Sequence, residues 1–302
     1  MKDIRGIFAP IPTLFKEDGT IDWDHLKANI ERLGQSRLAG LVVMGSNGEF
    51  VSLLEEEKVE LMKFVRKVLP AHKMMIAGTG CESAYATIRM NKAAADAGAD
   101  AVLVLNPTYY KGALTPDGLK AHFTAVADAS SLPVMIYNMP GNSSFNIPAA
   151  VTVALSKHPN IAGIKDSGGA IAQISEVIGY SKPGFSVFAG SGSFLMPTTI
   201  MGGKGGTLAV ANIAPDFCAE LFDLCVAGNY DKARQMQFDL IPLNAAVTAK
   251  FGVPGLKAAM EYLGYFGGPL RLPFLPLKEE LKPALYGIID EFQQKTGWNL
   301  KV

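Results

Sequence analysis

Short apolar runs rich in valine, isoleucine and leucine recur along the chain as far as residue 212. Runs of this length, bounded by glycine, proline and polar residues, are typical of buried β-strands. They lie at 6–15, 40–45, 74–80, 101–107, 133–140, 161–167, 185–191 and 205–212. The segments between them have helical spacing of apolar residues, at 22–34, 54–69, 84–97, 116–129, 148–157, 170–180, 194–201 and 215–227. This α/β alternation predicts a parallel (β/α)8 TIM barrel.

The strand pattern stops after residue 229, and the rest of the chain has a different organisation. Residues 230–251, 254–263 and 277–294 have helical patterns, separated by a glycine- and proline-rich stretch. We therefore predict a barrel domain with the active site at 1–228 and a C-terminal helical domain at 229–302. A doubly wound open sheet is the alternative, but such sheets often carry a dinucleotide-binding glycine motif, and none is complete here.

Composition limits the functions that are open to the chain. Its 302 residues are 49% hydrophobic, with 28 basic and 28 acidic side chains and no basic block, so we expect neither nucleic acid nor membrane as a partner. Residues 1–12 are too short and interrupted for a signal peptide. Three scattered cysteines favour a reducing compartment, and we expect a cytoplasmic protein. The histidines lack metal-ligand spacing, so we expect no metal and no other cofactor.

Polar clusters follow several of the predicted strands. In a (β/α)8 barrel the active site lies at the carboxyl ends of the strands, so these clusters should converge on one mouth. They are Ser46–Glu49, Thr108–Tyr110, Tyr137–Asn138, Lys165–Ser167 and Gly190–Ser193, and Thr207 within the eighth apolar run is a further candidate.

Lys165 ends a buried apolar run and is the candidate nucleophile. A lysine that burial keeps neutral attacks ketones and forms a Schiff base, although buried lysines also occur in structural ion pairs. Tyr137, at the tip of the preceding strand, is the candidate proton carrier, and a core tyrosine with a bonded hydroxyl is the alternative.

The segment around Ser46 and Asn47 could hold the carboxylate of a 2-keto acid. Its hydroxyl and amide groups, with the backbone amides beside Gly45 and Gly48 at a helix N-terminus, would supply donors, although Ser46 could instead be only a helix cap. Glu49 belongs to the same cluster, although it could be only a solvated acid in the first helical turn. Asp166 should point to the other face of its strand and anchor a neighbouring loop.

With these residues the chain resembles the dihydrodipicolinate synthase and N-acetylneuraminate lyase superfamily of class I aldolases. The resemblance rests on Gly45-Ser46-Asn47-Gly48-Glu49, Pro107-Thr108-Tyr109-Tyr110, Tyr137-Asn138-Met139-Pro140 and Gly163-Ile164-Lys165-Asp166-Ser167. It implies a pyruvate Schiff base on Lys165, acid–base chemistry by Tyr137, and carboxylate contacts from Ser46 and Asn47. It also implies a homotetramer in which Tyr110, or alternatively Tyr109, completes a proton relay across a subunit interface.

The resemblance further implies a pocket for a second substrate, and we take Asn142, Ser167, Gly190 and Thr207 as substrate-binding candidates. Synthases of the lysine pathway carry an arginine at the position of Asn142 and a Thr-Thr pair at the position of Ser46-Asn47. The segments 45–50, 165–169, 244–248 and 251–257 are more similar to 4-hydroxy-2-oxoglutarate aldolase.

We therefore expect a pyruvate-dependent aldolase that cleaves 4-hydroxy-2-oxoglutarate to pyruvate and glyoxylate. A dihydrodipicolinate synthase, or a related 2-keto-3-deoxy-acid aldolase or dehydratase, is the alternative. A catalytically idle sensor of keto acids is a third hypothesis, from a different class of function.

Overall fold

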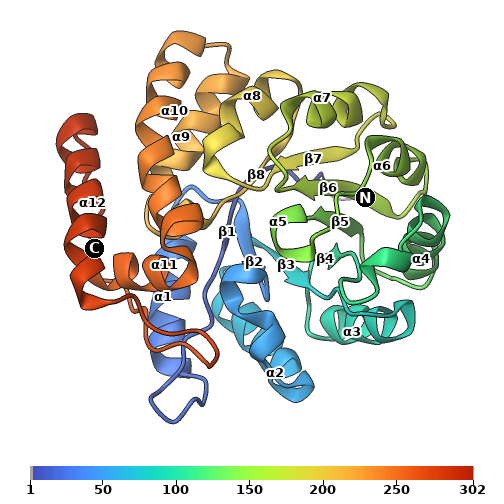
Figure 1. Cartoon of the computed structure of the whole chain (residues 1–302), viewed down its shortest axis with the longest axis horizontal. Helices are drawn as coiled ribbons and strands as arrows, with labels where there is room; N and C mark the ends of the chain where they lie inside the picture. Colours follow the sequence, from blue (N-terminus) through green and yellow to red (C-terminus); the bar gives the residue numbers. More distant parts are fainter. Residues whose placement is uncertain (1–2, 302) are drawn as a thin grey trace.

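In the computed structural model, which describes residues 3–301, eight parallel strands close into a barrel (Figure 1). Each strand pairs with its sequence neighbours, and β1 pairs with β8 to close the ring. The strands are β1 (Gly6–Pro10), β2 (Gly40–Val43), β3 (Met74–Gly78), β4 (Ala101–Leu105), β5 (Val134–Asn138), β6 (Ile161–Asp166), β7 (Ser186–Ala189) and β8 (Gly205–Thr207). The predicted (β/α)8 barrel is confirmed.

Helices surround the strands in a ring and three more follow it in the sequence. The ring consists of α1 (Trp23–Gln35), α2 (Glu55–Val68), α3 (Ala84–Asp96), α4 (Pro116–Asp128), the one-turn α5 (Pro140–Ser143), α6 (Ala149–Ser156), α7 (Ile171–Tyr180), α8 (Leu195–Ile200) and α9 (Pro215–Val226). The C-terminal helices are α10 (Tyr230–Ala245), α11 (Gly252–Tyr262) and α12 (Lys282–Thr296), with α12 outermost (Figure 1). The proposed division after residue 228 falls in the turn between α9 and α10. No helix in the range 3–301 is long and apolar enough to span a bilayer.

Several of the predicted elements have other bounds than expected: the first strand already stops at Pro10, and the last helix begins only at Lys282. The eighth strand stops at Thr207, and Ala209–Asn212 form a 3₁₀ turn (η5) instead. The side-chain amide of Asn212 donates to the Pro10 and Ala209 carbonyls, both at 3.0 Å, which holds this turn against β1. The helix predicted to reach residue 251 ends at Ala245 and continues as one π-helical segment, Ala246–Lys250.

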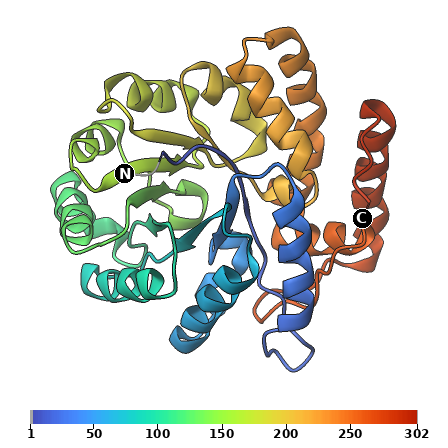
Figure 2. The same cartoon turned by 180° about the vertical axis from the view of Figure 1, so that it is seen from behind.

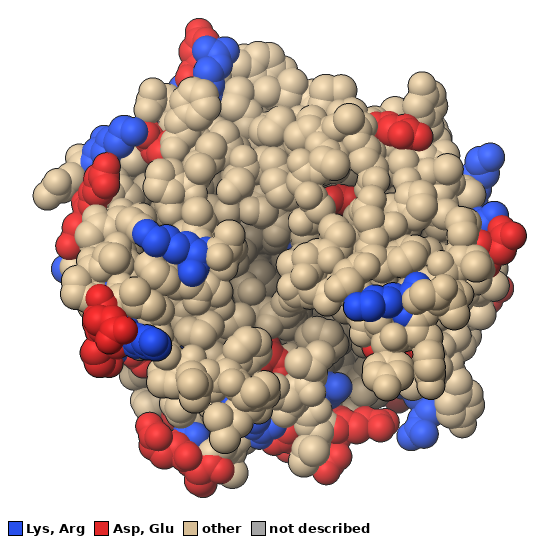
Figure 3. All heavy atoms as spheres, in the orientation of Figure 1, with Lys and Arg blue, Asp and Glu red and all other residues tan. Residues whose placement is uncertain are grey.

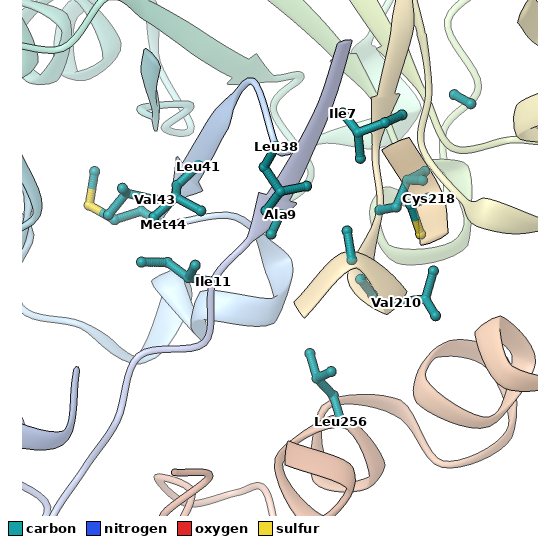
Figure 4. Close-up of a cluster of buried hydrophobic side chains, with 14 of the residues drawn as sticks. Ile7, Ala9, Ile11, Leu38, Leu41, Val43, Met44, Val210, Cys218 and Leu256 are labelled. Atoms are coloured by element: carbon teal, nitrogen blue, oxygen red, sulfur yellow. The ribbon is translucent and has the colours of Figure 1, made fainter. Parts of the chain in front are cut away.

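The strands are buried on both faces, as the uninterrupted apolar runs predict. One cluster fills the barrel interior and includes Phe8, Val42 and Phe188. A second, larger cluster fills the space between the strands and the helices. It also contains Leu256 of α11, which lies near Val210 and the strands in Figure 4. The C-terminal helices therefore share one core with the barrel.

Cys218 and Cys225 belong to this core, as their spacing along one helix predicts. Burial raises the pKa of the Cys225 thiol to about 11 and shifts that of Cys218 in the same direction. Both therefore stay protonated at neutral pH and act as small apolar side chains.

The opposite end of the barrel is closed by the N-terminal segment, which crosses it in Figure 2. The Ser186 hydroxyl donates to the Ile4 carbonyl at 2.9 Å, and Lys204 pairs with Asp3 at 2.9 Å. Gly202, with a φ of 107°, makes the tight turn between α8 and β8 that the glycine-rich segment there predicts. This closure leaves the carboxyl ends of the strands as the open end.

Candidate active site

Lys165 and Tyr137 occupy paired positions at the ends of β6 and β5. The Lys165 Nζ lies 4.0 Å from the centroid of the Tyr137 ring. Both side chains are almost fully buried, at 3% and 4% exposed. The structure therefore brings the candidate nucleophile and the candidate proton carrier together, as the order of the two strands predicts.

The Tyr137 hydroxyl is tuned by its surroundings. Burial alone would raise its pKa, but the positive charge of Lys165 and hydrogen bonds that include Ser46 outweigh burial and hold the pKa below its ordinary value. The Ser46 hydroxyl lies 3.3 Å from the Tyr137 hydroxyl. A tyrosine with a lowered pKa gives up and recovers its proton more readily near neutral pH.

The turn after β2 carries Ser46 and Asn47. They lie in a single 3₁₀ turn, Ser46–Gly48 (η1), and α2 begins only at Glu55, so the expected long-helix N-terminus is wrong. The side chain of Ser46 meets Tyr137 and caps no helix. The Asn47 side-chain nitrogen is buried with no hydrogen-bond partner within residues 3–301. An unpaired buried donor beside a cavity is suited to an anionic ligand.

Asp166 anchors the neighbouring loop, as predicted. Its carboxylate accepts hydrogen bonds from the Asn138 side chain and from the Gly168 backbone, both at 2.8 Å. The Asn138 side chain also accepts from the Ile147 backbone at 3.0 Å. These bonds fix the segment after β5 that carries Asn142.

Gly190 approaches the end of β6 too closely for any larger residue. A Cβ atom added there would lie 1.9 Å from the Ser167 hydroxyl oxygen. The Gly190 backbone N–H donates to the Asp166 carbonyl at 2.7 Å. The glycine therefore lets the ends of β6 and β7 close together beside Lys165.

These side chains border one cavity of about 490 Å³, within the usual range for small-molecule sites. Its lining includes all the predicted catalytic and substrate-binding residues except Tyr110, namely Ser46, Asn47, Tyr137, Asn142, Lys165, Ser167, Gly190 and Thr207. Apart from Lys165, no lining residue of this cavity, as found within residues 3–301, is charged. In Figure 3 the face around the central hollow is largely free of charged side chains, which gather at the periphery.

One wall of the cavity comes from the C-terminal helices, and sequence reasoning did not identify it. Val247 and Thr248 line the cavity from the π-helical segment, Val253 from α11, and Phe274 from the loop that follows. The only sequence signal for this wall was the resemblance of residues 244–257 to the aldolase. That resemblance gave no indication of where the segment lies.

Tyr109 and Tyr110 lie outside the cavity lining. Their loop is held by Glu82, which accepts from the Thr108 and Tyr109 backbone N–H groups, each at 3.0 Å. The two rings meet edge to face with centroids 5.0 Å apart, and the residues are 77% and 74% exposed. Within one chain they are therefore surface side chains.

Glu49 is not the solvated first-turn acid that was one interpretation of its position. Its side chain is fully buried and lies 2.7 Å from the Nζ of Lys257, a residue of α11 that is also buried. The carboxylate faces the C-terminal helices because the backbone of Glu49 takes a left-handed conformation, with φ of 51°.

Comparison with known proteins agrees with this geometry. The model of the dihydrodipicolinate synthetase family matches residues 3–292. The chain belongs to this family. It is accordingly an enzyme of the class I aldolase type, which works through a lysine Schiff base.

The relatives within the family carry two kinds of name. A 4-hydroxy-tetrahydrodipicolinate synthase of Methanothrix thermoacetophila is 33% identical over 97% of this chain and 98% of its own length. A probable mitochondrial 4-hydroxy-2-oxoglutarate aldolase of Emericella nidulans is 36% identical over 92% and 91%. The crystal structure of a dihydrodipicolinate synthase of Bacillus anthracis superposes with a TM-score of 0.92 at 31% identity, covering 96% of this chain and 99% of that one.

The contact between Ser46 and Tyr137 predicts a change in titration. In Ser46→Ala the hydroxyl that helps to lower the pKa of Tyr137 is lost, so this pKa should rise. Ultraviolet difference titration of tyrosinate would measure it, with Tyr137→Phe identifying the signal that belongs to Tyr137. An unchanged or lower pKa in Ser46→Ala would show that the Ser46 hydroxyl does not lower it.

Proposed function

We propose that the chain makes or breaks a carbon–carbon bond to pyruvate through a Schiff base on Lys165. The observation that carries this proposal is the pairing of Lys165 with Tyr137 inside a cavity with no other charged lining residue. No carboxylate of residues 3–301 lines this cavity, so Lys165 has no acidic partner there to compete with a ketone. Its amine is therefore available to attack a ketone.

In the cleavage direction the Lys165 amine adds to the C2 carbonyl of the keto acid and water leaves, which forms the imine. A base removes the proton of the C4 hydroxyl, the C3–C4 bond breaks, and its electron pair moves to the imine as an enamine. The aldehyde departs, C3 is protonated, and water releases pyruvate from Lys165. Tyr137 is the group within reach of Lys165 that can carry these protons, and its lowered pKa favours that role.

The carboxylate of pyruvate would lie in the turn that holds Ser46 and Asn47. This turn offers a hydroxyl, an unpaired side-chain amide and backbone N–H groups, all neutral donors. Such donors can bind a carboxylate without placing a second cation in the cavity.

The Schiff base itself can be trapped. Borohydride with pyruvate should reduce the imine and add an irreversible mass to Lys165, detected by mass spectrometry of peptides. Lys257 is a matched control, because it is equally buried but lies outside the cavity lining. A protein that binds pyruvate but gains no mass at Lys165 would instead be a sensor of keto acids.

The second substrate has two candidates. The names of the relatives favour the synthase, which condenses pyruvate with aspartate semialdehyde, since most of those found similar carry that name. The cavity lining favours 4-hydroxy-2-oxoglutarate, because Asn142 stands where the synthases have arginine. A neutral amide recovers less of the cost of desolvating the distal carboxylate of the semialdehyde.

The cavity lining predicts the outcome of a direct comparison. Cleavage of 4-hydroxy-2-oxoglutarate should exceed condensation with aspartate semialdehyde in kcat/KM by about tenfold or more, about 1.4 kcal/mol of transition-state preference. Both reactions are measured in one preparation, and Asn142→Arg should shift the ratio toward condensation. Faster condensation in the wild type would assign the chain to the synthase activity that the relatives' names favour.

We also propose a homotetramer in which Tyr110 of one chain reaches the site of another. Two adjacent exposed tyrosines are unusual on a free surface and are suited to an interface. Sedimentation should give four chains per particle. In that assembly Tyr110→Phe should lower turnover by about 10²-fold while Tyr109→Phe changes it little. A monomer of full activity, or the reverse order of the two variants, would contradict this assignment.

A further inference from the structure

The turn that carries Ser46 and Asn47 is flanked by residues with unusual backbone conformations. Met44 and Glu49 have φ angles of 59° and 51°, in the left-handed region that favours glycine. Within residues 3–301, Ser144 is the only other non-glycine residue with a positive φ. Such conformations persist only where surrounding contacts impose them. At Glu49 these contacts come from the C-terminal part of the chain.

Glu49 is held by a buried ion pair. One carboxylate oxygen lies 2.7 Å from Lys257 Nζ, and the two side chains are 0% and 2% exposed. The other oxygen accepts a hydrogen bond from the Arg271 backbone at 3.2 Å. Lys257 Nζ also donates to the Pro269 carbonyl at 2.8 Å and lies 4.9 Å from the centroid of the Phe15 ring. Both charges are thus surrounded by specific partners.

Arg271 connects the Glu49–Lys257 ion pair to a loop that lines another part of the cavity. Its guanidinium makes two hydrogen bonds to the Glu57 carboxylate, at 2.7 and 2.5 Å, and also donates to the Gly19 and Ser52 carbonyls. The same loop carries Phe274, which lines the cavity. The C-terminal segment and the turn after β2 are therefore tied together directly behind the cavity.

A buried pair of this kind is a weak source of net stability. The cost of removing two charges from water offsets most of their attraction, although removing only one partner costs about 3 to 5 kcal/mol. The pair does go together with a defined geometry, since Glu49 meets Lys257 with its backbone in the left-handed region and its N–H bonded to the Ser46 carbonyl at 3.2 Å. That conformation fixes the direction in which the preceding residues, Ser46 and Asn47, present their donors.

We propose that the Glu49–Lys257 ion pair is a positioning device that holds the Ser46–Asn47 turn in the geometry that binds the keto-acid carboxylate. The inference rests on the proposed function, because it requires pyruvate to bind in this turn. Glu49 and Lys257 touch no substrate atom, since neither residue lines the cavity. They act through the turn, and the C-terminal helices thereby take part in binding pyruvate.

A ketone without a carboxylate separates positioning from general damage. Borohydride trapping at Lys165 is measured against the concentration of pyruvate and, in parallel, of hydroxyacetone. In Glu49→Gln the pyruvate concentration for half-maximal trapping should rise about 10- to 100-fold, because small misplacements of binding groups have effects of this size. Hydroxyacetone, which makes no use of the carboxylate turn, should be trapped at a rate within about twofold of wild type.

Two further variants keep the test decisive. Glu49→Gln/Lys257→Met removes both charges, which avoids an unpaired buried lysine if the single variant unfolds, and should keep the defect toward pyruvate alone. Lys295→Met is the matched control. It breaks a 2.8 Å ion pair with Asp239 that also lies within the C-terminal helices, between residues that do not line the cavity. This control should trap both ketones like wild type.

Each other outcome of these experiments would overturn the inference. Equal loss of trapping with both ketones would show that the pair only supports the fold, and an unchanged pyruvate dependence in the double variant would show that it is not needed for binding. Either result overturns the inference while leaving the Schiff base on Lys165 in place. Absence of trapping in the wild-type protein overturns the proposed function and this inference with it.

Discussion

The register between two neighbouring strands determines most of what this protein can do. Because β5 and β6 pair with Tyr137 opposite Lys165, a buried amine and a phenol come to lie against each other at the open end of the barrel. A shift of one residue in that register would turn each side chain to the other face of the sheet. Three other contacts lie next to this pair. They are the close approach at Gly190, the anchoring of a loop by Asp166 and the contact of Ser46 with Tyr137.

The electrostatic design of the cavity follows from the same pair. Within residues 3–301, Lys165 is the only charged residue that lines the cavity. The rest of the lining consists of serine, threonine, asparagine, tyrosine, glycine and apolar side chains. Behind the wall, Glu49 pairs with Lys257 and Arg271 pairs with Glu57. These four charged side chains thus lie outside the cavity lining.

The sequence was informative where structure is local and repetitive. Apolar runs at regular intervals predicted the barrel, and the rule that active sites follow the strands predicted that Ser46, Tyr137, Lys165 and Gly190 would meet. It was uninformative where a contact joins distant segments. Nothing in the sequence near Glu49 indicates that its partner, Lys257, lies on α11. From its position after a strand alone, Glu49 could equally have been a solvated acid. The cavity wall formed by Val247, Thr248, Val253 and Phe274 was not predicted, for the same reason. The roles of the site residues stay predictions.

The cavity is lined by two kinds of segment, which differ in how firmly their backbone is held. The reactive pair stands on strands whose hydrogen bonds on both sides leave little freedom. The facing wall belongs to a π-helical segment, a helix end and a loop, whose backbone is not tied into the sheet. Changes in that wall can alter which aldehyde is accepted without moving the amine or the phenol. A scaffold divided in this way offers a route by which one Schiff-base chemistry can be adapted to many acceptors.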